Sequence, residues 1–155
     1  MITQHVTRIA LATIAGTGLA AGIASGALAP HGVAQAAAPT VGKALVAVAH
    51  RARFGTILVN GRGFALYYWA RETNGKVKCT GQCARVWPPV LLPAGAGAPR
   101  HVAGVMGTFG VVRRPNGTHQ LAFKRHPLYT YQGDKTPAQI LCDGVDGWHV
   151  YRLSH

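Results

Sequence analysis

The stretch Pro127-Leu128-Tyr129-Thr130-Tyr131-Gln132-Gly133-Asp134 echoes an earlier one, Ala65-Leu66-Tyr67-Tyr68-Trp69-Ala70-Arg71-Glu72. Both stretches read leucine, tyrosine, any residue, aromatic, two further residues, acid. Side chains of an extended strand alternate between two faces. In the earlier stretch both faces are apolar or aromatic, which predicts an interior strand that is covered on both sides.

The two stretches belong to a longer internal repeat. A shift of 62 residues, from Glu72 to Asp134, aligns residues 55–72 with residues 117–134 without a gap and places Val59 on Leu121. A shift relaxed by one residue also brings the tryptophan at 87 onto the one at 148. Self-similarity at a fixed period indicates a duplicated structural unit. We therefore expect two halves that cover each other's apolar faces.

Turn signals separate short apolar runs over the rest of the chain. Asn60-Gly61 and Asn116-Gly117 favour tight hairpins because these residues readily adopt positive φ. The runs predicted to be strands are 54–59, 64–69, 105–114, 119–123, 128–131 and 148–153. Short strands at this spacing predict an all-β fold. We expect one small domain over residues 54–153, a sandwich or barrel-like arrangement of two antiparallel repeats, about 54–92 and 105–153.

The N-terminal segment has the layout of a signal peptide. A basic start ending at Arg8 precedes an uncharged run rich in alanine and glycine, and Ala34-Gln35-Ala36 supplies a cleavage pattern. A membrane anchor is the alternative, because the run is long enough to span a bilayer. The glycines within the run favour cleavage, near Ala36–Ala38. We therefore expect residues 1–36 to be a signal peptide, residues 37–53 a linker or edge segment, and the mature chain to be secreted or held in the cell envelope.

The chain is strongly basic. Sixteen Lys and Arg against four Asp and Glu give a formal net charge of +12. Such a charge attracts polyanions without sequence specificity. Acidic envelope polymers and anionic lipid surfaces are the expected partners, whereas the export signal argues against specific nucleic-acid binding. The alternative is that the charge serves solubility alone, because the basic residues are scattered.

Three cysteines, Cys79, Cys83 and Cys142, follow the export signal. Oxidising compartments favour disulfides, and three cysteines can pair in three ways that each leave one over. Cys79 and Cys83 form a local pair in a glycine-containing loop. Cys142 would then be a free thiol or would pair with another chain.

Several of these segments together resemble the secreted-repeat family of bacterial lipoproteins, which a Tyr-x-(Phe/Trp/Tyr)-x-x-Asp motif describes. They are the Cys-x-x-x-Cys-Ala-x-x-Trp-Pro-Pro element at residues 79–89, the two tyrosine stretches and the closing Trp148. Residues 129–134 fit the motif in full, whereas Glu72 replaces its aspartate in the earlier copy. No cysteine lies near the cleavage pattern, so lipid attachment is not expected. The resemblance implies an exported envelope protein of two repeats and brings no established activity.

The motif residues have two interpretations. These residues are Tyr67, Trp69, Glu72, Tyr129, Tyr131 and Asp134. In the first, the aromatic rings fill the core and the acids accept hydrogen bonds from loop amides or pair with an arginine. In the second, the tyrosines and acids gather at one rim as a twofold ligand site, with His126 beside them. We favour the first.

Metal-binding and catalytic signatures are weak. The histidines show no HExxH spacing and the few serines form no Gly-x-Ser-x-Gly, so we assign no catalytic residue and no cofactor. His126, His149 and Cys142 are the least unlikely metal ligands. The sequence therefore predicts a non-enzymatic binding or structural module with a basic surface. The alternative is an exported metal- or redox-linked protein that uses the histidines and Cys142.

Overall fold

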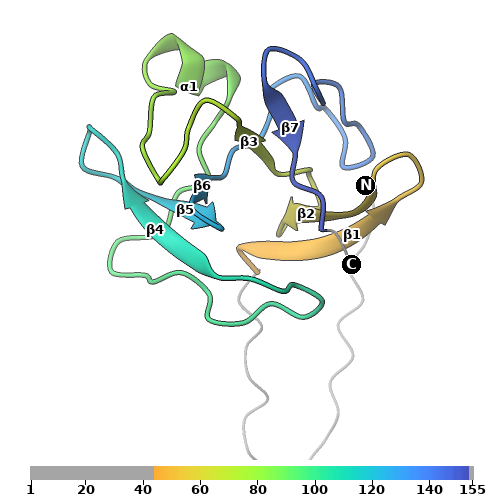
Figure 1. Cartoon of the computed structure of the whole chain (residues 1–155), viewed down its shortest axis with the longest axis horizontal. Coiled ribbons are helices and arrows are strands. Elements are labelled where there is room, and N and C mark those ends of the chain that lie inside the picture. Colours follow the sequence, from red (N-terminus) through yellow and green to blue (C-terminus); the bar gives the residue numbers. More distant parts are fainter. Residues whose placement is uncertain (1–43, 154–155) are drawn as a thin grey trace, which may run out of the picture. The chain divides into compact units, whose positions relative to one another are not determined.

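The computed structural model describes residues 44–153 (Figure 1). The predicted signal peptide at residues 1–36 and its cleavage site near Ala36–Ala38 lie outside these described residues. Within residues 44–153 the structure has no helix of the length and apolarity that crossing a membrane requires.

Seven short strands and one helix make up the described chain (Figure 1). They are β1 Val46–Arg51, β2 Gly55–Asn60, β3 Tyr67–Trp69, α1 Gln82–Val86, β4 Phe109–Arg113, β5 His119–Phe123, β6 His126–Pro127 and β7 Trp148–Val150. The strands form three antiparallel sheets, β1–β2, β3–β7 and β4–β5–β6. The all-β prediction is confirmed, and the sheets do not close into a barrel. The sequence did not predict α1, which lies in the polar loop that contains the disulfide.

Each repeat begins with a hairpin. β1 pairs with β2 along its whole length, from Val46 opposite Asn60 to Arg51 opposite Gly55. Residues 46–51 of the segment interpreted as a linker or edge are therefore a regular strand. β4 and β5 form the corresponding hairpin of the second repeat.

Strand pairing crosses between the repeats. β3 belongs to the first repeat and β7 to the second, and their register places Trp69 opposite Trp148. Tyr129 of the second repeat forms β-bridges with Tyr67 of β3 and with Pro89 of the first repeat. Each aromatic stretch thus pairs with the tryptophan segment of the opposite repeat.

The hydrogen bonds between the repeats correct the gapless alignment by one residue. The Leu58 amide donates to the carbonyl of Tyr151 at 2.9 Å, and the Leu121 amide donates to the carbonyl of Val90 at 2.8 Å. Leu58, and not Val59, therefore occupies the position equivalent to Leu121. The turn that follows in the first repeat is longer than its counterpart, which shifts the register.

The aromatic stretch of the first repeat supplies side chains to two apolar clusters. Leu66 and Tyr68 contribute to one cluster and Tyr67 and Trp69 to the other, as the alternation of strand side chains predicts. The buried members of the first cluster are Val46, Leu58, Leu66, Val90, Phe109, Leu121, Phe123, Leu128 and Tyr151. Those of the second are Ile57, Val59, Ala65, Tyr67, Cys79, Trp87, Tyr129, Trp148 and Val150. Both clusters draw residues from both repeats.

Candidate functional site

The motif tyrosines and acids form two buried pairs, each of which joins the repeats. The Tyr67 hydroxyl donates to Oδ2 of Asp134 at 2.8 Å. The Tyr129 hydroxyl donates to Oε2 of Glu72 at 2.7 Å. Three of these side chains are fully buried and Asp134 is 6% exposed. The tyrosine of each repeat thus binds the acid of the other repeat.

The second oxygen of each acid holds a loop. Oε1 of Glu72 accepts the amides of Lys78 and Cys79, at 2.6 and 2.7 Å. Oδ1 of Asp134 accepts the amide of Leu141 at 3.1 Å. Cys79 and Leu141 are equivalent positions of the two repeats, because the same 62-residue shift relates them. Each acid therefore fixes the loop that follows its own aromatic stretch.

This geometry supports the packing interpretation of the motif. The acids use their oxygens for protein donors; Glu72 is fully buried, whereas Asp134 is nearly buried and lies at the edge of a surface pocket. His126 does not accompany them, since its ring lies 4.9 Å from that of Tyr68 and 6.5 Å from that of Tyr151, between ring centroids. The structure keeps the two tyrosine–acid pairs apart from this histidine.

Burial shifts the pKa values of these tyrosines and of Asp134. It is the main cause that raises the pKa of Tyr67 and the pKa of Tyr129 far above the usual range, and the hydrogen-bonded acids add to the effect. Burial also raises the pKa of Asp134, partly offset by the hydrogen bonds from Tyr67 and Leu141. Both phenols therefore remain neutral donors over the whole physiological range of pH.

A further buried network lies only on the Glu72 side. Arg114, which is 5% exposed, donates to the side-chain oxygen of Gln120, and to the carbonyl of Cys79 at 2.7 Å. Gln120 donates in turn to the carbonyl of Leu128 at 2.8 Å. The register that places Leu58 on Leu121 also places Arg51 on Arg114, and Arg51 instead donates to the carbonyls of Gly63 and Pro137, each at 3.2 Å. Sequence reasoning missed Arg114, because nothing local distinguishes it from the exposed arginine that precedes it.

Four rings stack in a column across the boundary between the repeats. Trp87 and Trp148 lie in its middle, 3.8 Å apart between centroids and nearly parallel. Trp69 stacks on Trp148 at 5.3 Å, and Tyr131 lies on Trp87 at 4.6 Å. Each end ring thus lies on the tryptophan of the opposite repeat. Like the tyrosine–acid pairs, this stack of rings joins residues of one repeat to residues of the other.

The cysteines pair locally. Cys79 and Cys83 form a disulfide with their Cα atoms 5.2 Å apart, which confirms the local pair. Cys142 is a half-buried free thiol. It faces the hydroxyl of Tyr131 and raises the pKa of that phenol.

The candidate metal ligands do not converge in the structure. His126 and His149 lie against Tyr68, at 4.9 and 5.5 Å between ring centroids, whereas Cys142 lies beside Tyr131. Over residues 44–153 no three His, Cys, Asp or Glu side chains are grouped so that they could hold a metal ion.

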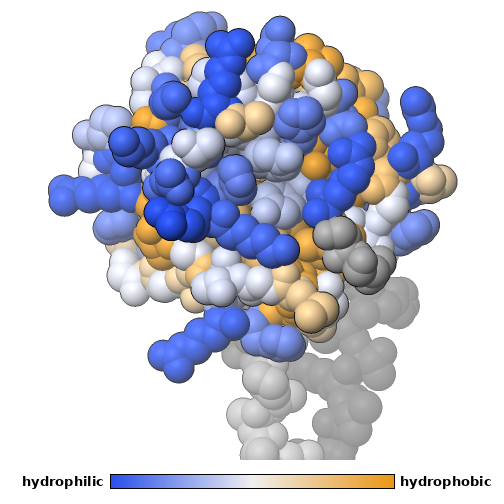
Figure 2. All heavy atoms as spheres, viewed as in Figure 1, coloured by the Kyte–Doolittle hydropathy of each residue, from blue (hydrophilic) through white to orange (hydrophobic). Residues whose placement is uncertain are grey.

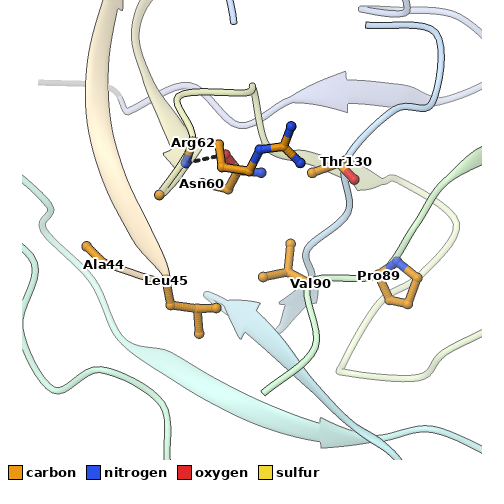
Figure 3. A pocket seen from close by; sticks show the side chains of 8 residues that line it. Ala44, Leu45, Asn60, Arg62, Pro89, Val90 and Thr130 are labelled. Carbon is orange, nitrogen blue, oxygen red and sulfur yellow. Dashed lines mark hydrogen bonds between the residues drawn. The ribbon is translucent and has the colours of Figure 1, made fainter. Parts of the chain in front are cut away.

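Two shallow pockets adjoin at Arg62. One, of about 330 Å³, has Leu45 and Val90 on its apolar side, and its Asn60 side chain accepts the Arg62 amide at 2.9 Å (Figure 3). The other, of about 270 Å³, is more polar and includes Arg62 and Lys135. Neither of these two pockets places a nucleophile beside a base.

Comparison with known proteins agrees with the repeat. The model of a family described as a secreted repeat of unknown function matches residues 41–91 and 110–151. The first match contains β1 to α1 and the second contains most of β4 to β7. No curated protein and no solved structure matches the chain.

Proposed function

This chain belongs to the family of secreted repeats of unknown function, and on that premise we propose that it is a non-enzymatic binding or structural module of the cell envelope. Its basic surface holds acidic envelope polymers or anionic lipid head groups. The observation that carries this proposal is that the fold buries two of its four acidic side chains, Glu72 and Asp134, away from the basic surface.

The acids leave most of the positive charge uncompensated. Glu72 and Asp134 are buried against tyrosines. Among residues 44–153 the pair Asp143–Arg152 is the single ion pair. The exposed cations are Arg53, Arg62, Arg71, Lys76, Lys78, Arg85, Arg100, Arg113, Lys124, Arg125, Lys135 and Arg152. All of these except Arg152, which pairs with Asp143, are available to anions outside the protein.

The surface is not uniformly polar. Hydrophilic side chains project from much of the face in Figure 2, and apolar residues are exposed between them. The exposed large apolar residues include Leu91, Met106 and Val111. Mixed charge and apolar surface suits a polyanion or a lipid head-group layer better than it suits a dissolved small ion.

The experiment is retention on vesicles of neutral phosphatidylcholine with and without phosphatidylglycerol, over a series of salt concentrations. We expect retention on the anionic vesicles at low salt and a steep loss as salt rises, because electrostatic binding is screened. Retention on an immobilised acidic polymer should follow the same salt dependence. No retention on either anionic material at low salt would contradict the proposal.

A further inference from the structure

The hairpin turn between β5 and β6 holds two basic residues in a strained conformation. Phe123 pairs with His126, so that Lys124 and Arg125 alone form the turn. Their φ angles are +46° and +68°. A two-residue hairpin with both φ angles positive is normally built from Asn, Asp or Gly, because a Cβ atom is disfavoured there.

The first repeat makes its corresponding, longer turn without non-glycine residues at positive φ. The corresponding turn of the first repeat contains Gly61 and Gly63, and Gly63 takes the positive φ of +84° without a side chain. The second repeat instead places two long cations where glycine or asparagine would be relaxed. Strained residues of this kind persist where their side chains have a use.

The strained turn borders a groove of about 250 Å³. Val112 and Ala122, which share one face of the β4–β5 pair, supply apolar lining to the groove, and no carboxylate lines it. The Val112 side chain is half-buried and lies against Gly75, which also lines the groove. Lys124 and Arg125 stand at the same groove. The apolar lining of the groove therefore lies next to two cationic side chains.

Backbone hydrogen bonds hold Lys124 and Arg125 in place, and neither side chain pairs with an acidic residue of the described chain. The Gly75 amide donates to the carbonyl of Arg125 at 2.9 Å, and the Lys124 amide donates to the carbonyl of Thr108 at 3.0 Å. Nζ of Lys124 lies 5.6 Å from the centroid of the Phe123 ring. Neither side chain forms an ion pair within the described chain. The backbone bonds thus fix the turn beside the groove and leave its charges for a ligand.

We propose that this basic-turn groove, formed by Val112, Ala122, Lys124 and Arg125, binds an anionic membrane lipid. The head-group phosphate lies between the two cations, and the first part of the acyl chain lies on the apolar lining. An acidic polymer would need the cations alone, whereas the adjoining apolar side chains of Val112 and Ala122 fit an amphiphile. The inference rests on the proposed function and names its site and its class of ligand.

The decisive variant is Lys124→Asn with Arg125→Gly, made in the full chain. An Asn-Gly pair suits this turn, so the thermal midpoint should rise while binding to phosphatidylglycerol vesicles falls. Each cation near an anionic surface is worth about 1 kcal/mol, so the loss should be about 20-fold to 30-fold. A gain in stability together with a loss of binding excludes misfolding as the cause.

The matched control is Arg71→Gln with Arg85→Gln, which removes two exposed charges that do not line this groove. The control should lose clearly less binding than the turn variant. Equal losses would overturn the groove and leave the proposed function standing. If the wild-type protein does not bind anionic vesicles at all, the proposed function falls together with the groove.

Soluble probes test the apolar part. Dodecyl phosphate should bind more tightly than inorganic phosphate, and Val112→Ser should weaken the first without changing the second. Equal binding of the two probes would overturn the lipid assignment. An acidic peptide that binds the groove more tightly than dodecyl phosphate would overturn it as well, in favour of a peptide ligand.

Discussion

Tyr67 and Tyr129 exchange backbone hydrogen bonds of 2.8 and 2.9 Å between nitrogen and oxygen, one donated by each residue. From this shared bridge their hydroxyls extend to the acid of the opposite repeat. One motif therefore serves both as the contact between the repeats and as the anchor of the loops that follow. The two halves are interlocked rather than merely adjacent.

Removal of either hydroxyl should destabilise the whole domain. Tyr129→Phe leaves Glu72 buried with one donor fewer, and Tyr67→Phe does the same to Asp134. An unsatisfied buried acceptor costs about 1–3 kcal/mol, so we expect a loss of that size in the free energy of unfolding. Chemical denaturation of each variant measures it.

Tyr68→Phe is the matched control. The Tyr68 hydroxyl has no hydrogen-bond partner recorded in the described chain, and its ring packs against Tyr151 and two histidines. Its loss of stability should stay well below that of the other two variants. Equal effects of all three substitutions would show that the tyrosine–acid bonds contribute nothing specific.

Alkaline pH should unfold the protein through its buried phenols. Burial raises the pKa of Tyr151 to about 12, with the neighbouring Tyr68 adding to the shift. A raised phenol pKa contributes stability that is complete below about pH 10, the unfolded value, and is lost as pH rises through the folded value. The free energy of unfolding should therefore fall above about pH 10.

Denaturation curves with tyrosinate absorbance at each pH would check this fall. Tyr151→Phe should make the decline shallower than in the wild-type protein. Ionisation of all five tyrosines at their ordinary pKa, with the near-ultraviolet circular dichroism unchanged, would contradict the expectation.

Acid pH should act through Asp143. Burial by itself would raise its pKa, but the hydrogen bonds from Arg152 and from the Val150 amide, with the Arg152 charge, lower it overall. A lowered carboxyl pKa gives stability that is present above about pH 4, the unfolded value, and is lost as pH falls through the folded value. Asp143→Asn should therefore be less stable than wild type at pH 7. The two proteins should converge in strong acid, and a difference that persists there would contradict the prediction.

The disulfide should contribute only modestly to the free energy of unfolding. It closes a ring of only a few residues, for which the chain-entropy estimate is about 2 kcal/mol. Cys79→Ala with Cys83→Ala should lose about that much and should still fold. Reducing agent should lower the stability of the wild-type protein and leave the double variant unchanged. Cys142→Ala is the control, because that thiol is already free.

Local patterns in the sequence predicted most of the strands and the covered aromatic stretch, but the strand expected at residues 128–131 lies at His126–Pro127 instead. Alternation placed Leu66 and Tyr67 on opposite faces, and the structure buries both. The sequence did not indicate β1 as clearly, because small residues such as Ala47 and Ala49 carry little periodicity. β1 is stabilised by its pairing with β2, which is a tertiary effect.

The exchange between repeats could not be read from the sequence. Both repeats carry the same motif. On chemical grounds alone, Tyr67 could have bonded Glu72 of its own repeat as readily as it bonds Asp134 of the other repeat. The choice depends on where the chain places the two halves, and residue spacing does not encode that placement. The same holds for Arg114, which burial against Gln120 distinguishes from its exposed neighbours.

The most direct test of the interlock is to cut the folded chain between its halves. A protease site placed at the exposed residues 94–97 would divide the chain after the first repeat. We predict that the two fragments stay together on size exclusion, keep the near-ultraviolet circular dichroism of the intact chain and unfold in one transition. Fragments that separate without denaturant, or that each unfold in a transition of their own, would contradict the account.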